Sequence, residues 1–574
     1  MKKKLVAILL TAAMTVSLAA CGSSSSDTAA STPANDAAAS TEEAADDAAA
    51  DSTEAATEEA AAEIDPNDPW AGWANIDTSE PVVINYMCVS DKPTNPDTDE
   101  MMEVLNGILQ EKVNATLELN YIGWTDYLTN YNLTLTPMDG SVDLVVTADD
   151  WLDAWQNVER GAFMELPDEM LQTYAPATWQ QVEEDGDWDM CRYTDGQIYL
   201  IPEDNYRQWT NHGFIYRLDW AKEAGLEDGV HSWDDMTTYV QYCLDTFPDM
   251  IPWDVVGGNS INECTGGYLA SAGVESYPLT GVAAGIVGYP GNQVKCQYLE
   301  ETDALVAYGN LMKTWNDMGV WRTDVLNNST SDTRQAFREG RGAVDQHHTE
   351  TWTDLASPGR TANVFYQEDP DAAAGFFWFG EESNFLVNLS ILHGAMAISS
   401  GSQNPERALM VYDLLRNDPE CYRLFMYGIE GEQYELVGEN EYKRPEGYND
   451  TEDKVDTAFW AGRNDDIGLK DSTLNWDVIE PLYAEYDEIA VDNPYLQFLP
   501  VTDEISGTMS TLTEICNNYL KLLTYGQFQG TAEECVAEFQ DQLRAAGVED
   551  VVANLQAQMD AFYGTSAAET TAAE

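Results

Sequence analysis

Residues 143–166 read DLVVTADDWLDAWQNVERGAFMEL and predict a buried strand followed by a short helix. The apolar, β-branched run Leu144–Thr147 suits a parallel strand that is covered on both faces. Asp149 or Asp150 is expected to cap the helix, because a carboxylate accepts the free N–H groups of the first helical turn. Gly161 is expected to follow the last turn.

The turn between this strand and this helix is a candidate ligand site. In open α/β sheets, ligands lie beyond the carboxyl ends of the strands. The turn therefore places Asp149, Asp150 and Trp151 where a ligand would be met. The alternative is that both acids only cap the helix and that Trp151, Trp155 and Val158 pack as one helical face.

The preceding segments repeat the alternation of strand and helix. We expect a strand at 81–89, a helix at 99–113, a strand at 115–122 and a helix at 125–135. This order predicts a parallel, right-handed α/β lobe. Asp91 follows the first strand and is a second point where a ligand could be met.

Further elements follow down the chain. The sequence predicts a turn followed by a strand at 195–202 and strands at 211–218, 342–345 and 386–399. It also predicts helices at 219–224, 305–318, 332–339 and 405–416, a capped helix start at Ser232, and a mostly helical region from 477 to 562. No internal repeat is found.

The N-terminal residues are expected to be a targeting segment and a tether. Residues 1–20 combine a lysine-rich start with a short apolar stretch, as in a secretory signal peptide. They end in Leu-Ala-Ala before Cys21, which resembles the bacterial lipobox, so Cys21 is the expected lipidation site, carrying fatty acyl chains such as palmitate. Residues 21–64 form an acidic Ala/Ser/Thr/Glu tether, and residues 565–574 form a similar tail.

The net charge of the chain argues against some classes of binding partner. The chain of 574 residues has 101 Asp and Glu against 27 Lys and Arg, a formal charge of −74. Nucleic acid and anionic membrane surfaces would be repelled, whereas neutral or cationic ligands fit. The cysteines other than Cys21 form no CxxC motif, so we expect most to be buried small side chains rather than redox or metal groups.

Several motifs in order resemble one protein family. They are DLVV to GAFMEL at 143–166, DGQIYLIP at 195–202 with YRLDWA at 216–221, AFREGRGAV at 336–344, AIS at 397–399 with PERA at 405–408, and YGIEGEQY at 427–434. Behind a lipobox, and over residues 80–564, the chain resembles the extracellular solute-binding proteins of family 1, the substrate-binding lipoproteins of bacterial carbohydrate ABC importers.

The resemblance implies an α/β, two-lobed, periplasmic-binding-protein-like fold of type II, with the ligand in a cleft between the lobes and closure by hinge motion. It assigns residues 65–205 and 389–445 to lobe 1, and 206–388 and 446–564 to lobe 2. It also implies a monomer at the outer face of the cell membrane that delivers its solute to membrane permease subunits. The chain lacks GxxxxGK[ST] and so is not the ATPase.

Family 1 proteins mostly bind sugars, so the resemblance implies a carbohydrate ligand, expected to be an oligosaccharide. Aromatic rings cover the C–H face of a sugar, and carboxylates accept hydrogen bonds from its hydroxyls. The candidate ligand-binding residues are Asp91, Asp149, Asp150, Trp151, Glu203, Trp209, Tyr268, His348, Glu350, Trp352, Trp378 and Trp476. For each tryptophan the alternative is packing in a core. Trp155, one turn beyond Trp151, is expected to be core.

Other functions remain open. A peptide-binding importer component is the closer alternative, and a surface glycosidase or an adhesive lipoprotein are the others. No GxSxG, HExxH or Cys–His signature is present, so we expect no enzyme and no cofactor. We also expect no metal, because adjacent His347 and His348 on a strand would face opposite sides and no DxDxDG calcium loop is present.

Overall fold

The computed structural model describes residues 68–203, 209, 212–258, 260–358, 364–449 and 452–564. The expected signal peptide, the lipidation site Cys21, the tether and the tail at 565–574 lie outside these residues. Within the described ranges, no helix combines the length and the apolar character that a membrane span requires.

The first sheet has five strands in the order β2-β1-β3-β11-β4. Its strands are β1 (Val82–Val89), β2 (Ala115–Ile122), β3 (Leu144–Thr147), β4 (Ile201–Pro202) and β11 (Ala395–Ile398). β1 runs parallel to both β2 and β3, as the sequence predicts, while β11 is antiparallel to β3 and β4. The chain therefore steps from β1 to one side for β2 and back to the other side for β3. In this topology the crevice for a ligand lies at the carboxyl ends of β1 and β3.

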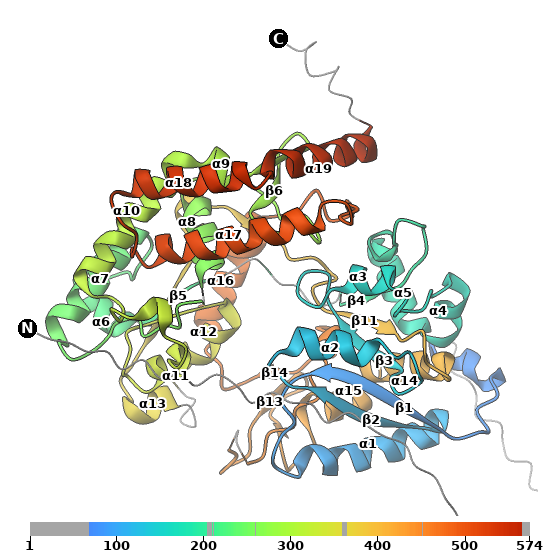
Figure 1. Cartoon of the computed structure of the whole chain (residues 1–574). Coiled ribbons are helices and arrows are strands. Elements are labelled where there is room, and N and C mark those ends of the chain that lie inside the picture. Colours follow the sequence, from blue (N-terminus) through green and yellow to red (C-terminus); the bar gives the residue numbers. More distant parts are fainter. Residues whose placement is uncertain are drawn as a thin grey trace, which may run out of the picture. The chain divides into compact units, whose positions relative to one another are not determined.

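Helices cover this sheet and complete a first hydrophobic core. They include α1 (Asp97–Val113), α2 (Tyr127–Leu135), α3 (Ala154–Glu159), α4 (Asp168–Tyr174), α5 (Pro176–Asp185), α14 (Pro405–Asn417) and α15 (Pro419–Tyr427). α1 and α2 lie on either side of strands β1–β3 (Figure 1). The apolar face of α1 that the periodicity predicts, including Leu105 and Leu109, is fully buried.

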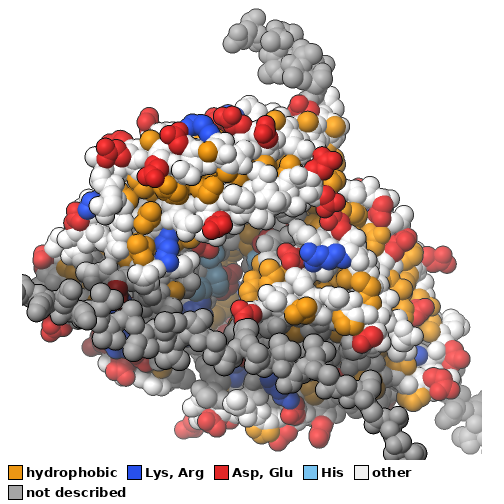
Figure 2. Space-filling view, in the orientation of Figure 1, with side chains coloured by type: hydrophobic (Ala, Val, Ile, Leu, Met, Phe, Trp, Pro, Cys, Tyr) orange, Lys and Arg blue, Asp and Glu red, His pale blue; other side chains and the backbone are white. Residues whose placement is uncertain are grey.

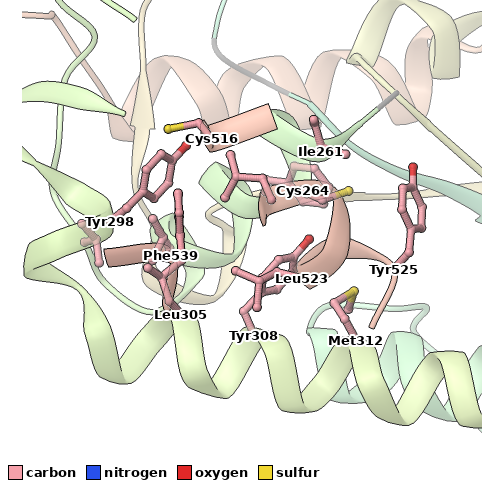
Figure 3. Close-up of a cluster of buried hydrophobic side chains, with 14 of the residues drawn as sticks. Ile261, Cys264, Tyr298, Leu305, Tyr308, Met312, Cys516, Leu523, Tyr525 and Phe539 are labelled. Atoms are coloured by element: carbon pink, nitrogen blue, oxygen red, sulfur yellow. The ribbon is translucent and has the colours of Figure 1, made fainter. Parts of the chain in front are cut away.

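A second core surrounds the antiparallel sheet β8-β5-β9. Its strands are β5 (Gly213–Arg217), β8 (Val344–His347) and β9 (Ala374–Trp378). The main helices around it are α7 (Trp233–Thr246), α8 (Ile261–Ser271), α10 (Thr302–Met318), α17 (Ser506–Thr524), α18 (Ala532–Ala545) and α19 (Val548–Tyr563). Side chains of α8, α10, α17 and α18 meet in this core, where the Tyr308 hydroxyl lies 3.0 Å from Thr524 Oγ1 (Figure 3).

The remaining elements are short or connect the two cores. They are α6 (Leu218–Glu223), β6 (Ile286–Tyr289), β7 (Gln293–Cys296), α9 (Gln297–Glu300), α11 (Thr333–Arg338), α12 (Thr349–Leu355), α13 (Val364–Glu368), β10 (Leu386–Val387), β12 (Glu435–Leu436), β13 (Glu441–Lys443), β14 (Lys470–Asp471), α16 (Trp476–Ile489), β15 (Ala490–Val491) and the 3₁₀ turns η1 (Ala71–Asn75), η2 (Asp187–Cys191), η3 (Val325–Asn327), η4 (Glu381–Ser383) and η5 (Trp460–Gly462).

The segment around η5 packs with the first core. The Tyr86 hydroxyl donates to the carbonyl of Ala458 (2.9 Å), and the Tyr412 hydroxyl donates to that of Ala461 (2.7 Å). Phe459 is buried in the same cluster. Residues 458–461 thus pack with the first core. The boundary at residue 446 that the resemblance implies stays a prediction.

The opening stretch differs from its prediction at the helix start. α3 begins at Ala154 with Asp153 as its N-cap, and no side chain caps it, so the expected capping by Asp149 or Asp150 is wrong. The reason is a turn over residues 148–154, closed by the hydrogen bond from Ala154 N to Ala148 O (3.0 Å), from which the helix starts. Gly161 follows the last turn with φ 73°, and Trp155 is core with 5% exposure, both as predicted.

Two other local predictions are confirmed. Ser232 Oγ accepts a hydrogen bond from Asp235 N (3.0 Å) at the start of α7. The eight cysteines in the described part of the chain are all buried, as small apolar side chains would be. The strand-like run predicted at 386–399 forms two separate strands, β10 and β11.

Candidate functional site

The carboxyl ends of the three parallel strands bring polar and aromatic side chains to one edge of the first sheet. Asp91 follows β1, Trp124 follows β2 and Asp149 follows β3. Asp91 Oδ1 accepts a hydrogen bond from Trp124 N (3.1 Å), which ties the first two strand ends together. This edge is the crevice that the strand order predicts.

Four aromatic rings form a cluster at this edge. Trp151 lies against Trp124, Trp460 and Tyr127, with centroid distances of 6.2, 5.6 and 6.0 Å. Trp124 and Trp460 are 5.5 Å apart. Trp124 is 41% exposed, and Trp151 is half-buried with its Nε1–H donating to the carbonyl of His393 (3.0 Å). We call Trp124, Tyr127, Trp151 and Trp460 the aromatic cluster.

Only Trp151 of this cluster was predicted from the sequence. Trp124 could have been found by the same rule, because it follows the predicted strand 115–122 at its carboxyl end. Tyr127 begins the next helix. Trp460 has no local signal, because it comes from a distant 3₁₀ turn that reaches the first core by long-range packing.

A histidine that the sequence analysis missed joins the cluster to the acids. His393 Nδ1 lies 2.8 Å from Asp150 Oδ2. Burial by itself lowers the pKa of His393, but the hydrogen bond and charge of Asp150 raise it more, so that it lies above its usual range. Asp150 therefore has a partner that can carry a positive charge.

Two buried carboxylates lie beside this pair. Asp149 is 6% exposed and Glu203 is 3% exposed, and one oxygen of each, Oδ1 and Oε2, has no hydrogen-bond partner. Burial raises the pKa of both carboxyls to about 7, with the Asp150 charge as the next contribution for Asp149. The charges of Arg463 and His393 oppose the rise for Glu203. Such shifts mark candidate functional groups.

Gly394 has no side chain, and the Glu203 carboxylate occupies the space beside it. Glu203 N donates to the carbonyls of Ile391 and Gly394 (both 3.0 Å). A Cβ on Gly394 would overlap the Glu203 carboxylate. The segment with Ile391 and Gly394, which leads from the second sheet back to the first, thus packs closely against Glu203.

The second sheet contributes His348 and Glu350. His348 Nδ1 lies 2.8 Å from Glu350 Oε2, and the rings of His348 and His212 are 6.0 Å apart. Burial raises the pKa of Glu350, but the hydrogen bond and charge of His348, with the more distant charge of Arg463, bring it below its usual range. The charge of Arg463 thus lowers the pKa of two acids, Glu203 after a strand of the first sheet and Glu350 after a strand of the second sheet.

The adjacent His347 has a separate environment. Arg334 donates to His347 Nε2, and burial followed by the charge of Arg334 lowers the pKa of His347 to about 3. His347 and His348 lie with centroids 5.0 Å apart. Within the described ranges, no group of three or more His, Cys, Asp or Glu side chains is placed to hold a metal ion.

Two cavities flank this row of charged residues. The larger has a volume of 810 Å³ and is lined by Trp209, Glu350, Arg463, Trp476 and Tyr483, among others. The smaller has a volume of 380 Å³ and is lined by Asp149, Asp150 and residues of the second core. The space-filling view shows histidine side chains within a hollow of the surface, next to apolar side chains (Figure 2).

The predicted site residues divide into two groups. Asp149, Asp150, Glu350, Trp209 and Trp476 line one of the two cavities, and Asp91, Trp151, Glu203 and His348 lie beside them in the contacts given above.

Three predicted residues pack elsewhere. Trp352 lies in α12, stacks on Phe376 (5.9 Å) and donates to the carbonyl of Ala374 (3.1 Å). It is buried in a core because α12 begins directly after His348 and turns Trp352 inward. Trp378 ends β9 with 2% exposure. Tyr268 on α8 packs on Trp233 and Tyr308. Neither cavity, as the described residues form it, is lined by these three.

Comparison with known families identifies one C-terminal match. Residues 494–564, which contain α17, α18 and α19, match the model of a domain of unknown function, DUF3502. This region forms part of the second core.

Relatives match over most of the chain. A carbohydrate ABC transporter substrate-binding protein of Streptococcus pneumoniae is 23% identical over 497 residues, which are 85% of this chain and 92% of the relative. The crystal structure of the N-glycan transport solute-binding protein NgtS from the same species superposes with a TM-score of 0.62 at 19% identity, covering 85% of this chain and 100% of NgtS.

A third protein has the same fold. The S. pneumoniae ABC-transporter substrate-binding protein FusA, solved in complex with kestose, superposes with a TM-score of 0.59 at 14% identity, over 84% of this chain and 100% of FusA. The predicted two-lobed solute-binding fold is thereby confirmed. In sequence and in fold, the chain is similar to substrate-binding proteins of carbohydrate ABC transporters.

Proposed function

We propose that this protein captures an oligosaccharide outside the cell and delivers it to the permease of an ABC importer. The observation that carries the proposal is the aromatic cluster at the ends of β2 and β3. Indole and phenol faces stack on the C–H faces of sugar rings, and the adjacent Asp150–His393 pair exchanges hydrogen bonds with hydroxyls. The relatives named above support this assignment.

The size of the site supports a ligand of several sugar rings. The cavities of 810 and 380 Å³ fall within the range of about 300–1,000 Å³ that ligand pockets occupy. Asp149 after β3 and Leu279 of the second core line the smaller one, and Met426 of α15 and Glu350 of α12 line the larger one. A ligand held between them would favour a closed arrangement through contacts that only this arrangement makes, and that population shift is the signal to the permease.

The same residues support binding rather than turnover. The buried acids Asp149 and Glu203 lie beside indoles and histidines that can hold a glycan in place. The chain is acidic throughout, so carboxylates near one another are expected on composition alone and indicate no reaction. We propose that the bound oligosaccharide is released unchanged.

A thermal-shift screen tests this function. Neutral and charged oligosaccharides are expected to raise the melting temperature of the purified protein, because a ligand that binds only the folded state stabilises it by about 2.7 kcal/mol at 100 times its Kd. Peptides of similar mass serve as the comparison, and mass spectrometry of the recovered glycan checks for cleavage. Stabilisation by peptides alone would reject the sugar assignment, and shortened glycans would reject the binding role.

We further propose that the mature protein is anchored by a lipid on Cys21 and held off the membrane by the acidic segment after it. The Leu-Ala-Ala-Cys sequence behind an apolar stretch supports the anchor. In a bacterial host, the wild-type protein is expected in the membrane fraction with its N-terminal peptide acylated by mass spectrometry. Cys21→Ser is expected to be released into the soluble fraction. Membrane retention of that variant would argue against the anchor.

A further inference from the structure

The smaller cavity differs in charge from the rest of the site. Asp149, Asp150, Asp153 and Gln156 of the first lobe form one wall, and residues 278–283 of the second lobe face them. Its described lining holds three carboxylates and no Lys, Arg or His. The larger cavity, in contrast, includes Arg463 and Lys470.

Each of the three carboxylates has a partner side chain. Asp150 Oδ2 pairs with His393 Nδ1 (2.8 Å), Asp153 Oδ2 accepts from Asn132 Nδ2 (2.9 Å), and the Asp149 carboxylate accepts from Ser390. Asp149 is nevertheless different, because it is only 6% exposed and its second oxygen, Oδ1, has no hydrogen-bond partner. Gln156 Oε1, on the same wall, also has none. The wall therefore presents acceptors without donors.

A buried carboxylate oxygen without a donor is destabilising, and a ligand that supplies the donor would bind well. A hydroxyl supplies a donor but leaves the charge uncompensated. An ammonium group supplies three donors and the missing positive charge. The raised pKa of Asp149 agrees with this reading, since burial and the Asp150 charge cause it and a cation beside the carboxylate would reverse it.

The opposite wall suits the carbon skeleton that carries such a group. Leu279, Val282 and Leu496 present apolar surface, and Thr280 and Asn493 present polar groups at the same cavity. A volume of 380 Å³ is small for a whole oligosaccharide but suitable for the end of one. The cavity thus combines an acidic wall with an amphipathic wall, as a sugar ring with an amine substituent requires.

We propose that this cavity is a subsite for a sugar residue with a free amino group, whose ammonium is held by Asp149 and Gln156. The proposal rests on the proposed function and adds the ligand class to it. The protein would then select oligosaccharides that contain an unsubstituted amino sugar over their N-acetylated counterparts.

Matched pairs of ligands test the proposal. Oligosaccharides of glucosamine and of galactosamine are titrated calorimetrically at pH 7, each as the free amine and as its N-acetylated form. In at least one pair the amine is expected to bind about tenfold tighter or more, as for a hydrogen bond to a charged group. Asp149→Asn is expected to abolish this preference, since the isosteric amide retains the shape and loses the charge.

Two further variants keep the test decisive. Thr280→Trp fills the cavity from the other lobe and is expected to abolish the preference even if Asp149→Asn does not fold. Asp249→Asn makes the same charge change at an exposed position after α7 and is expected to retain the preference.

The outcomes separate the two proposals. Equal or tighter binding of the N-acetylated forms would overturn the amine subsite and leave the proposed function in place. An amine preference that survives both Asp149→Asn and Thr280→Trp would also overturn it. If no oligosaccharide of either form bound, both proposals would fall.

Discussion

Replacing Trp151 by alanine is expected to weaken oligosaccharide binding about 30-fold, the effect of losing an interaction of about 2 kcal/mol. Trp151 contacts each of the other three members of the aromatic cluster and follows the end of β3. Its removal takes one ring face from the cluster and leaves the His393 carbonyl without the indole N–H donor. Titration calorimetry with the oligosaccharide found in the thermal screen measures the change.

The fold is expected to tolerate this substitution, because Trp151 is only half-buried. Trp179→Ala is the matched control. Trp179 is also half-buried, stacks on another tryptophan, Trp188, at 4.9 Å, and lies on α5 in the same lobe, away from the strand ends that carry the aromatic cluster. It is expected to retain wild-type affinity. If Trp151→Ala bound normally, or if the folded protein were lost, Trp151 would be a packing residue.

Replacing Asp413 by alanine is expected to destabilise the first lobe by about 4 kcal/mol, the scale of breaking a buried, fully bonded charged group. Asp413 is completely buried on α14. Its Oδ1 accepts from Thr178 N (2.8 Å), Thr178 Oγ1 (2.6 Å) and Asn417 Nδ2 (3.0 Å), and its Oδ2 accepts from Trp70 Nε1 (2.8 Å) and Ala177 N (3.2 Å). All of these donors would lose an acceptor.

Urea denaturation followed by circular dichroism measures the loss. Trp70→Phe removes one donor and keeps the carboxylate, so it is expected to cost about 1 kcal/mol, the net value of one hydrogen bond. If Asp413→Ala were no more destabilising than Trp70→Phe, the carboxylate would not organise this junction of three segments. Ligand affinity of the folded fraction is expected to be unchanged in both variants.

Periodicity and strand composition predicted the first sheet well. β1, β2 and β3 and the helices between them follow the predicted ranges within a few residues, because each has a clear apolar pattern and local turns. The capping of α3 was misjudged, since Asp149 lies in a turn closed by Ala148 and Ala154 rather than at the helix start. Asp149 is buried, and its backbone N–H donates to Leu392 O (3.0 Å).

Part of the candidate site was predicted from the rule that ligands lie beyond the ends of strands. Asp149, Asp150 and Trp151 came from that rule, and Trp124 would have come from it. His393, Trp460 and Arg463 could not, because they reach the site from segments more than 200 residues away in sequence that have no regular pattern. Trp352 was misplaced because nothing in the sequence marks where β8 ends and α12 begins.

The aromatic cluster also determines at which stage of folding the protein can first bind its ligand. Trp124 and Trp151 occur early in the chain, whereas Trp460 occurs more than 300 residues later. A chain that folds from its N-terminus would form the first sheet strands before the last ring of the cluster is available. The complete ligand surface therefore exists only after the chain has returned from the second core to the first and added Trp460, so ligand binding indicates that the whole first lobe has folded.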